Sequence, residues 1–94
     1  MLSRIPVSLD KLDKKELRKQ ILRVAIIAEL DAISLYEQLA SMTDDENLKK
    51  VLLDVAKEEK THVGEFLEML LSIDKEQVEE IEKGREEIRE ILEK

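Results

Sequence analysis

The sequence has no cysteine and no tryptophan, one proline and two glycines in 94 residues. Without cysteine the chain can form neither a disulfide nor a thiolate metal site, so thiol chemistry is excluded. Tyr36 and Phe66 are its only aromatic residues. What is abundant instead is 43% hydrophobic and 41% charged residues, the composition of packed amphipathic helices. The chain is therefore predicted to be an all-α protein.

Long apolar runs and basic stripes are also missing. No run approaches the roughly 18 apolar residues of a membrane helix, and the start of the chain lacks the basic and apolar regions of a signal peptide. The formal net charge of −7 is spread over interleaved Lys and Glu, which disfavours a phosphate backbone and favours cations. We therefore expect a soluble, cytoplasmic protein that binds no membrane and no nucleic acid.

Length and hydrophobic periodicity predict one domain, 1–94, with three helices. The first helix is expected at 13–41, the second at 47–72 and a C-terminal helix at 74–93. Residues 1–12 contain the proline and only scattered apolar side chains, so they are expected to form an extended arm. Polar residues between the first two helices predict a turn. The predicted fold is an antiparallel two-helix hairpin plus a C-terminal helix.

Two of the predicted helix starts carry residues with the spacing of a capping pair. Asp13 is followed by Glu16, and Asp74 by Gln77, so each aspartate can accept a hydrogen bond from the first turn of its helix. Gly84 lies inside the last predicted helix and is the position at which a kink or a break is anticipated.

The first predicted helix is apolar around most of its circumference between residues 17 and 40. Such a helix is buried from several sides. A chain of 94 residues cannot easily supply that burial, so partner subunits are expected to do so.

Three residues in the two long helices are candidate metal ligands. Glu59 and His62 are three residues apart on the apolar face of the second helix, where they can bind one ion. Glu29 is another carboxylate on an apolar face, in the first helix. With the turn centred near Asp44, Glu29 and Glu59 each lie fifteen residues from it, and antiparallel helices place them at equal depth. Because an unpaired carboxylate is expensive to bury, a metal ion is its expected partner.

This donor set narrows the choice of metal. Carboxylates and one imidazole suit iron or manganese and accept zinc, whereas the absence of thiolates argues against structural zinc. A di-iron carboxylate bundle takes one Glu from each of two helices and Glu-x-x-His from each of the other two. The chain carries half of that set. A second copy would complete a di-iron centre with one Fe per chain, and Mn or Zn are its substitutes. The alternative is a non-enzymatic helical assembly module whose buried Glu and His fix the register.

The stretches AELDAISLYEQ (28–38) and DVAKEEKTH (54–62) resemble the encapsulated ferritins, half-length ferritin-like proteins housed in encapsulin nanocompartments. The resemblance spans roughly residues 15–72 and includes the thirty-residue interval between Glu29 and Glu59. It implies a ferritin-like half-bundle that dimerises into a four-helix bundle, and a ring of such dimers. Its partner is then the encapsulin shell protein, which stores the iron mineral inside the nanocompartment.

The same resemblance implies an activity and its ligands. The expected enzyme is a ferroxidase, which oxidises Fe(II) to Fe(III) at a di-iron site shared between two subunits, with Glu29, Glu59 and His62 as ligands. A rubrerythrin-like di-iron peroxidase is a weaker hypothesis, because a chain without cysteine has no rubredoxin-type iron centre. In some archaeal members the ferritin-like domain is fused to the front of the shell protein. Free-standing cargo and a fused domain both remain open from the sequence.

Tyr36, Asp31 and Glu58 are candidates for the surroundings of the site. The resemblance places Tyr36 beside the ligands, whereas from the residues alone it is a packed aromatic whose hydroxyl has a hydrogen-bond partner. Asp31 lies on the far side of its helix from Glu29, and Glu58 lies near the edge of the apolar face of the second helix, as does Glu65. All three acids are expected to be solvated or to form salt bridges. Some family members carry an acid directly before the first ligand Glu, where this chain has Ala28.

Overall fold

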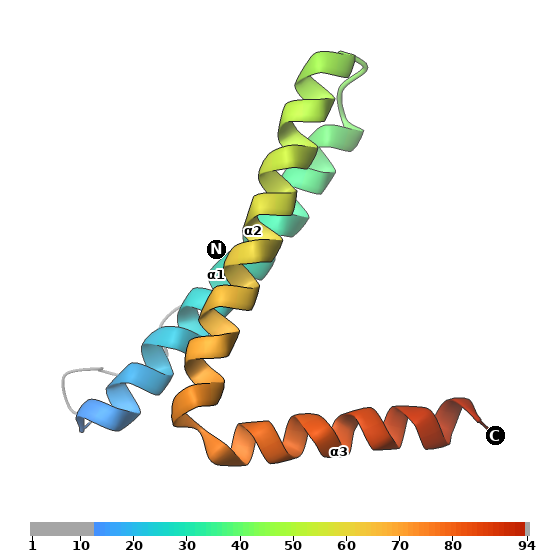
Figure 1. Ribbon diagram of the computed structural model, residues 1–94. Helices are drawn as coiled ribbons and strands as arrows, with labels where there is room; N and C mark the ends of the chain where they lie inside the picture. The colour runs from blue at the N-terminus through green and yellow to red at the C-terminus, as the bar shows by residue number, and fades with distance from the viewer. Residues whose placement is uncertain (1–12, 94) are drawn as a thin grey trace.

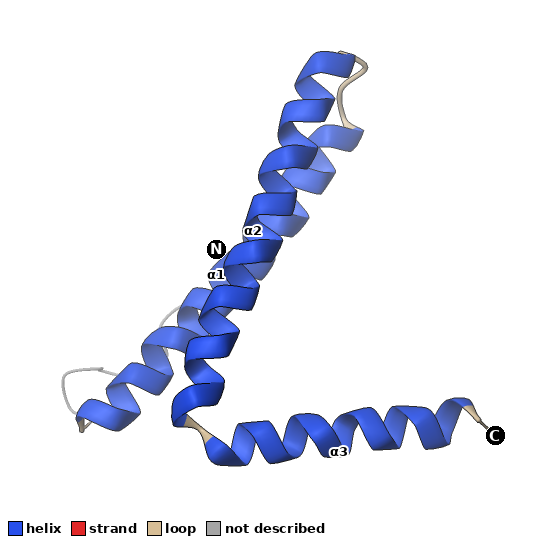
Figure 2. Cartoon of the chain, viewed as in Figure 1, coloured by secondary structure: helices blue, strands red, loops and turns tan. Residues whose placement is uncertain are grey.

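The computed structural model describes residues 13–93, which form three helices: α1 (Lys14–Ser41), α2 (Glu46–Ile73) and α3 (Lys75–Leu92). α1 and α2 lie side by side as an antiparallel hairpin, and α3 leaves the end of α2 and projects away from it, so the chain is L-shaped (Figure 1). No strand occurs in the described part of the chain (Figure 2). The predicted all-α hairpin with a C-terminal helix is confirmed.

Each helix begins after an aspartate N-cap. The cap carboxylates accept hydrogen bonds from backbone N–H groups of the first turn: Asp13 from Glu16, Asp45 from Asn47 and Leu48, and Asp74 from Gln77. The two capping pairs predicted from the sequence are therefore present. The expected break at Gly84 is wrong, because α3 is one continuous helix through that residue. The expected arm at 1–12 lies outside the described residues.

Few side chains of the hairpin are fully buried. The buried apolar residues are Leu22, Ala40, Ala56 and Leu70, which come from α1 and α2 only. Large apolar side chains on all three helices stay exposed, among them Leu35, Val51, Met69 and Ile91. Two helices can cover only one side of each other, so the remaining apolar sides of α1 and α2 face solvent in the single chain. None of the described helices has the length and apolar character needed to cross a bilayer.

The corner between α2 and α3 is fixed by Asp74, which is only 7% exposed. Its Oδ1 accepts the backbone N–H of Gln77 at 3.1 Å, and its Oδ2 accepts a hydrogen bond from the Arg23 guanidinium of α1 at 3.2 Å. The hydrogen bond from Gln77 lowers the pKa of Asp74, the positive charges of Lys19 and Arg23 lower it further, and burial opposes them. One carboxylate thus joins α1 to the start of α3.

Candidate metal centre

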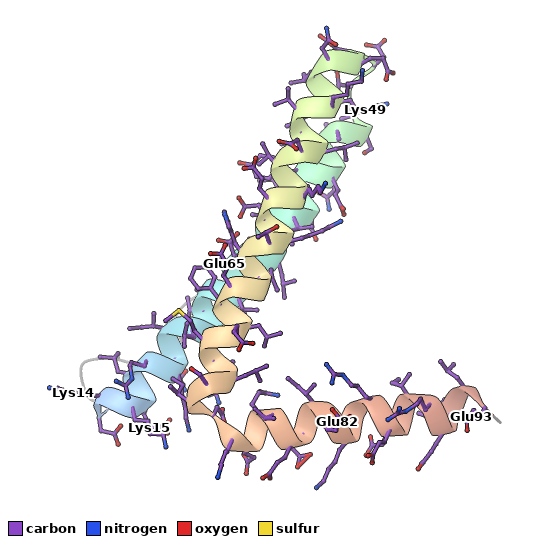
Figure 3. All side chains as sticks on the ribbon, viewed as in Figure 1. Lys14, Lys15, Lys49, Glu65, Glu82 and Glu93 are labelled. Carbon is purple, nitrogen blue, oxygen red and sulfur yellow. The ribbon has the colours of Figure 1, made fainter. Side chains whose placement is uncertain are left out.

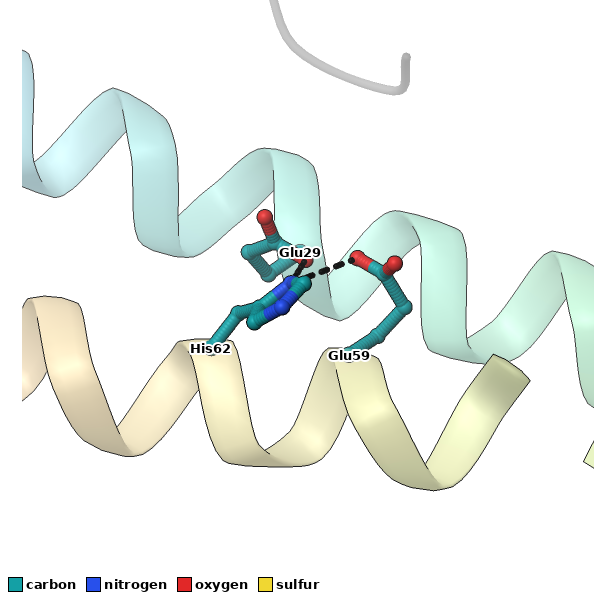
Figure 4. A group of neighbouring side chains, drawn as sticks. All are labelled: Glu29, Glu59 and His62. Atoms are coloured by element: carbon teal, nitrogen blue, oxygen red, sulfur yellow. Dashed lines mark ion pairs between the residues drawn. The ribbon is translucent and has the colours of Figure 1, made fainter. Parts of the chain in front are cut away.

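The hairpin brings together the three candidate ligands from its two helices. Glu29 comes from α1, whereas Glu59 and His62 come from successive turns of α2 (Figure 4). One potential ligand atom of each residue lies within 4.8 Å of those of the other two. The turn at residues 42–45 includes Asp44, so the two glutamates lie at matching depths of the hairpin, as their spacing from the turn predicts.

A single ring nitrogen faces both carboxylates. The distance from His62 Nδ1 to Glu29 Oε2 is 3.4 Å, and that from Nδ1 to Glu59 Oε2 is 3.6 Å (Figure 4). The contact to Glu29 is not a hydrogen bond: Glu29 Oε2 is buried and has no hydrogen-bond partner within residues 13–93. A buried carboxylate oxygen without a partner destabilises the protein by about 1–3 kcal/mol or more. Among residues 13–93, no group satisfies this oxygen.

The spacing of these atoms suits a metal ion. Two donors that are each about 2.1 Å from one ion are about 3.0 Å apart at a right angle and about 3.4 Å apart at a tetrahedral angle. The two measured separations, 3.4 and 3.6 Å, are close to this range. Carboxylate oxygens with one imidazole nitrogen match iron, manganese or zinc. An ion held by three protein donors also has coordination positions left open, which a water molecule or an oxidant could occupy.

The candidate centre lies at one edge of the hairpin. The side chains of Glu29 and Glu59 are 18% and 20% exposed, whereas that of His62 is 44% exposed. A cavity of about 370 Å³ adjoins the centre and includes Glu65 in its lining. From the sequence, Glu65 is interpreted as a solvated or salt-bridging carboxylate and not as part of the site. Its position three residues after His62 was the available signal, but the edge of an apolar face usually carries a solvated carboxylate.

Tyr36, Asp31 and Glu58 lie outside the group of three donors. Tyr36 is partly buried, two helical turns after Glu29 on the same side of α1, or about 10 Å further along the axis. Asp31 leaves α1 about 160° away from Glu29, and Glu58 is exposed about 100° away from Glu59. Tyr36 therefore lies on the same side of α1 as Glu29 but too far along the helix to join the three donors. Asp31 and Glu58 lie on other sides of their helices than Glu29 and Glu59.

A helical hairpin with one Glu on its first helix and Glu-x-x-His on its second is half of a ferritin-like bundle. The family model named EncFtn-like matches residues 5–85, so the chain belongs to the EncFtn-like family. This finding confirms the resemblance to the encapsulated ferritins.

Two relatives extend the comparison. The chain is 58% identical over 85 residues to the ferritin-like-encapsulin shell fusion protein of Pyrococcus furiosus, an alignment that covers 90% of this chain and 25% of that protein. It is 38% identical over 79 residues to the encapsulin nanocompartment cargo protein EncC of Myxococcus xanthus, covering 84% of this chain and 60% of that protein. The chain thus spans about a quarter of the first relative and three fifths of the second.

The fold also matches a solved structure. The crystal structure of the encapsulated ferritin domain from Pyrococcus furiosus superposes on this chain with a TM-score of 0.83 at 56% sequence identity. The superposition covers 96% of this chain and 94% of that one. The hairpin with its C-terminal helix is therefore the fold of an encapsulated ferritin domain, a half-length ferritin-like fold.

Proposed function

We propose that two copies of this chain form a ferroxidase, which oxidises Fe(II) to Fe(III) at a di-iron site shared between them. The observation that carries this proposal is the buried Oε2 of Glu29, which faces His62 Nδ1 at 3.4 Å and has no hydrogen-bond partner in the described part of the chain. A divalent cation between Glu29, Glu59 and His62 would satisfy that oxygen and offset the charge of both carboxylates.

The need for a second copy follows from the donor count. One chain supplies a single Glu29 and a single pair of Glu59 and His62, which is half of the ligand set of a di-iron bundle. A twofold axis beside the site would bring two glutamates from α1 and two Glu-x-x-His pairs from α2 around two ions. The exposed apolar side chains of α1 and α2 support this arrangement, because a second hairpin would cover them.

The three residues have distinct parts in the reaction. When bound, iron supplies the redox step, in which each Fe(II) gives one electron to dioxygen or peroxide. The carboxylates of Glu29 and Glu59 are anionic donors, so they stabilise the added positive charge of the Fe(III) product more than that of the Fe(II) substrate. His62 binds as a neutral ring through the nitrogen that faces both carboxylates, and holds no proton there in the bound state.

The relatives support a cellular setting for this reaction. One is named as a fusion to an encapsulin shell and the other as a cargo protein of an encapsulin nanocompartment. We therefore propose that this chain forms a ring of dimers inside an encapsulin nanocompartment in the cytoplasm. The shell protein is then its partner and the compartment stores the Fe(III) that it produces.

The test is Fe(II) oxidation by protein freed of metal, followed by ferric absorbance after exposure to air. We expect Glu59→Ala and His62→Ala to lose rapid oxidation while their helix content stays nearly unchanged, since both side chains bind the ion and neither caps a helix. Glu68→Ala, an exposed acid elsewhere on α2, is the matched control.

Each alternative function predicts a different result from this assay. Equal oxidation by wild type and both variants would reject the site and favour an assembly module, in which Glu and His only fix the register. Oxidation much faster with hydrogen peroxide than with dioxygen would favour the rubrerythrin-like peroxidase.

A further inference from the structure

Glu65 extends the series of metal-type donors on α2 by one more turn. Glu59, His62 and Glu65 follow each other at intervals of three residues, so each lies about 4.5 Å further along the helix and about 60° further around it. Their exposure rises in the same order, from 20% for Glu59 to 44% for His62, and Glu65 is exposed on the outside of α2 (Figure 3). In the order Glu59, His62, Glu65, the series therefore runs from the interior of the hairpin toward solvent.

The cavity beside the candidate centre is lined by two of these residues, His62 and Glu65, and also by Glu29. Its volume is about 370 Å³, and its lining consists of Glu29, His62, Glu65, Phe66 and Met69. Phe66 and Met69 make part of its wall apolar, so cation-binding groups in the lining are limited to two carboxylates and the imidazole. Glu29 is mostly buried and Glu65 is exposed. A cation that enters the cavity from solvent consequently meets Glu65 before it meets Glu29.

We propose that Glu65 captures Fe(II) from solvent and passes it to His62 and Glu29. The inference rests on the proposed ferroxidase function, because it names the route by which the substrate of that reaction reaches the site. In the described part of the chain no ion pair involves Glu65, so no direct contact with a Lys, Arg or His occupies its carboxylate.

Glu65 is outside the group of three donors. Its charge should therefore change the rate at which the metal ion binds more than the equilibrium affinity of the site. One carboxylate attracts a divalent ion about 6 Å away strongly enough in water to raise its local concentration roughly tenfold. Salt weakens this attraction, since the Debye length falls from about 10 Å at 0.1 M to about 3 Å at 1 M. If Glu65 acts through its charge, the effect of its substitution on the association rate should decrease as the salt concentration rises. A substitution that alters the three-donor site would act at low and high salt alike.

The experiment measures the association rate of Co(II) with metal-free protein by stopped flow, with free Co(II) reported by a fluorescent chelator. Glu65→Gln should slow association by roughly three- to tenfold at low salt and by much less at 1 M salt. Glu65→Asp keeps the charge and should restore most of the rate. Glu68→Gln is the control, because Glu68 is exposed on the same helix but does not line the cavity. The amount of Co(II) bound at equilibrium should be the same in all four proteins.

A wild-type rate in Glu65→Gln, or equal slowing in Glu68→Gln, would overturn the capture role. Fe(II) oxidation provides a second measurement, in which Glu65→Gln should lower the rate at limiting Fe(II) more than the rate at saturating Fe(II). Wild-type protein that takes up Co(II) at a Glu65-dependent rate but does not oxidise Fe(II) would support the capture role and reject the ferroxidase function. Wild-type protein that binds no Co(II) would overturn both.

Discussion

Arg23 and Asp74, 51 residues apart in the sequence, are joined by a hydrogen bond of 3.2 Å between the guanidinium Nη2 and the carboxylate Oδ2. Asp74 also caps α3 through Gln77. Removal of this one carboxylate should therefore weaken two contacts at once. We expect Asp74→Ala to lower the melting temperature by several degrees more than Asp13→Ala, because Asp13 is an exposed cap without a cross-helix partner among residues 13–93. Equal losses measured by circular dichroism would show that the contact to Arg23 contributes nothing.

The same carboxylate predicts a pH dependence. The pKa of Asp74 in the folded chain is below its ordinary value of 3.8, chiefly through the hydrogen bond from Gln77. The unfolded chain then binds the proton more tightly, so the stabilisation is complete above the ordinary pKa and is lost as the pH falls through the lowered one. The stability difference between wild type and Asp74→Asn should be constant near neutral pH and shrink below about pH 3.8. Urea unfolding at a series of pH values measures it, and a difference that grows in acid would contradict it.

Glu29 should affect stability and metal binding in opposite directions. Its buried Oε2 has no hydrogen-bond partner among the residues that the structure describes, so Glu29→Gln removes a charge that is costly to bury and should stabilise the metal-free chain by about 1 kcal/mol. The same change removes an anionic donor and should weaken metal binding at least tenfold. Thermal unfolding with and without Co(II) tests both effects. Glu68→Gln, on the exposed surface of α2, should change neither.

Iron should promote association of the chains at neutral pH. Two chains at a shared site bring together two Glu29 and two Glu59 carboxylates, and their repulsion and desolvation oppose assembly without metal. These carboxylates carry four negative charges, which the four positive charges of two Fe(II) ions would balance. Metal binding and assembly should therefore favour each other. Sedimentation under anaerobic conditions, with and without Fe(II), measures the linkage. The same large mass in both samples at every dilution would show that the site does not control assembly.

Gly64 and Gly84 should both tolerate alanine. Apart from the adjoining residues and the backbone of the same helix turns, no atom of the described residues lies within 4 Å of the position that a Cβ would take, and both glycines lie inside helices without positive φ. Each substitution should stabilise its helix by about 0.5–1 kcal/mol, because alanine loses less backbone entropy than glycine. Chemical denaturation of the metal-free chain is the measurement. A loss of stability at Gly84 in the assembled protein alone would indicate that a neighbouring subunit packs closely against it.

The sequence was most informative where short-range rules apply. Asp13 and Asp74 mark helix starts through capping, which depends on residues three positions away. The proximity of Glu29 to Glu59 and His62 could be predicted because the turn fixes the pairing of antiparallel helices. The metal-ligand role of these residues stays a prediction.

Other features of the structure depend on contacts between helices, which the spacing of apolar residues along one helix does not predict. The bond between Arg23 and Asp74 requires the direction in which α3 leaves the hairpin, and a hydrophobic stripe gives the face of a helix but not its direction. Glu65 was interpreted from the sequence as a solvated or salt-bridging acid for a related reason, since its place beside the candidate ligands depends on a cavity lined by residues of two helices. A residue at the edge of an apolar face has no such signal in the sequence alone.

The L shape places the far end of α3 away from the part of the hairpin that carries the candidate ligands. α3 is an 18-residue rod of about 27 Å that points away from the hairpin, and its far end is remote from Glu29, Glu59 and His62 (Figure 1). Anything tethered at that end is held at a distance by a stiff spacer, clear of the edge at which the candidate ligands lie. The direction of α3 thus keeps its far end away from the candidate ligands, and an attachment at that end would not contact them directly.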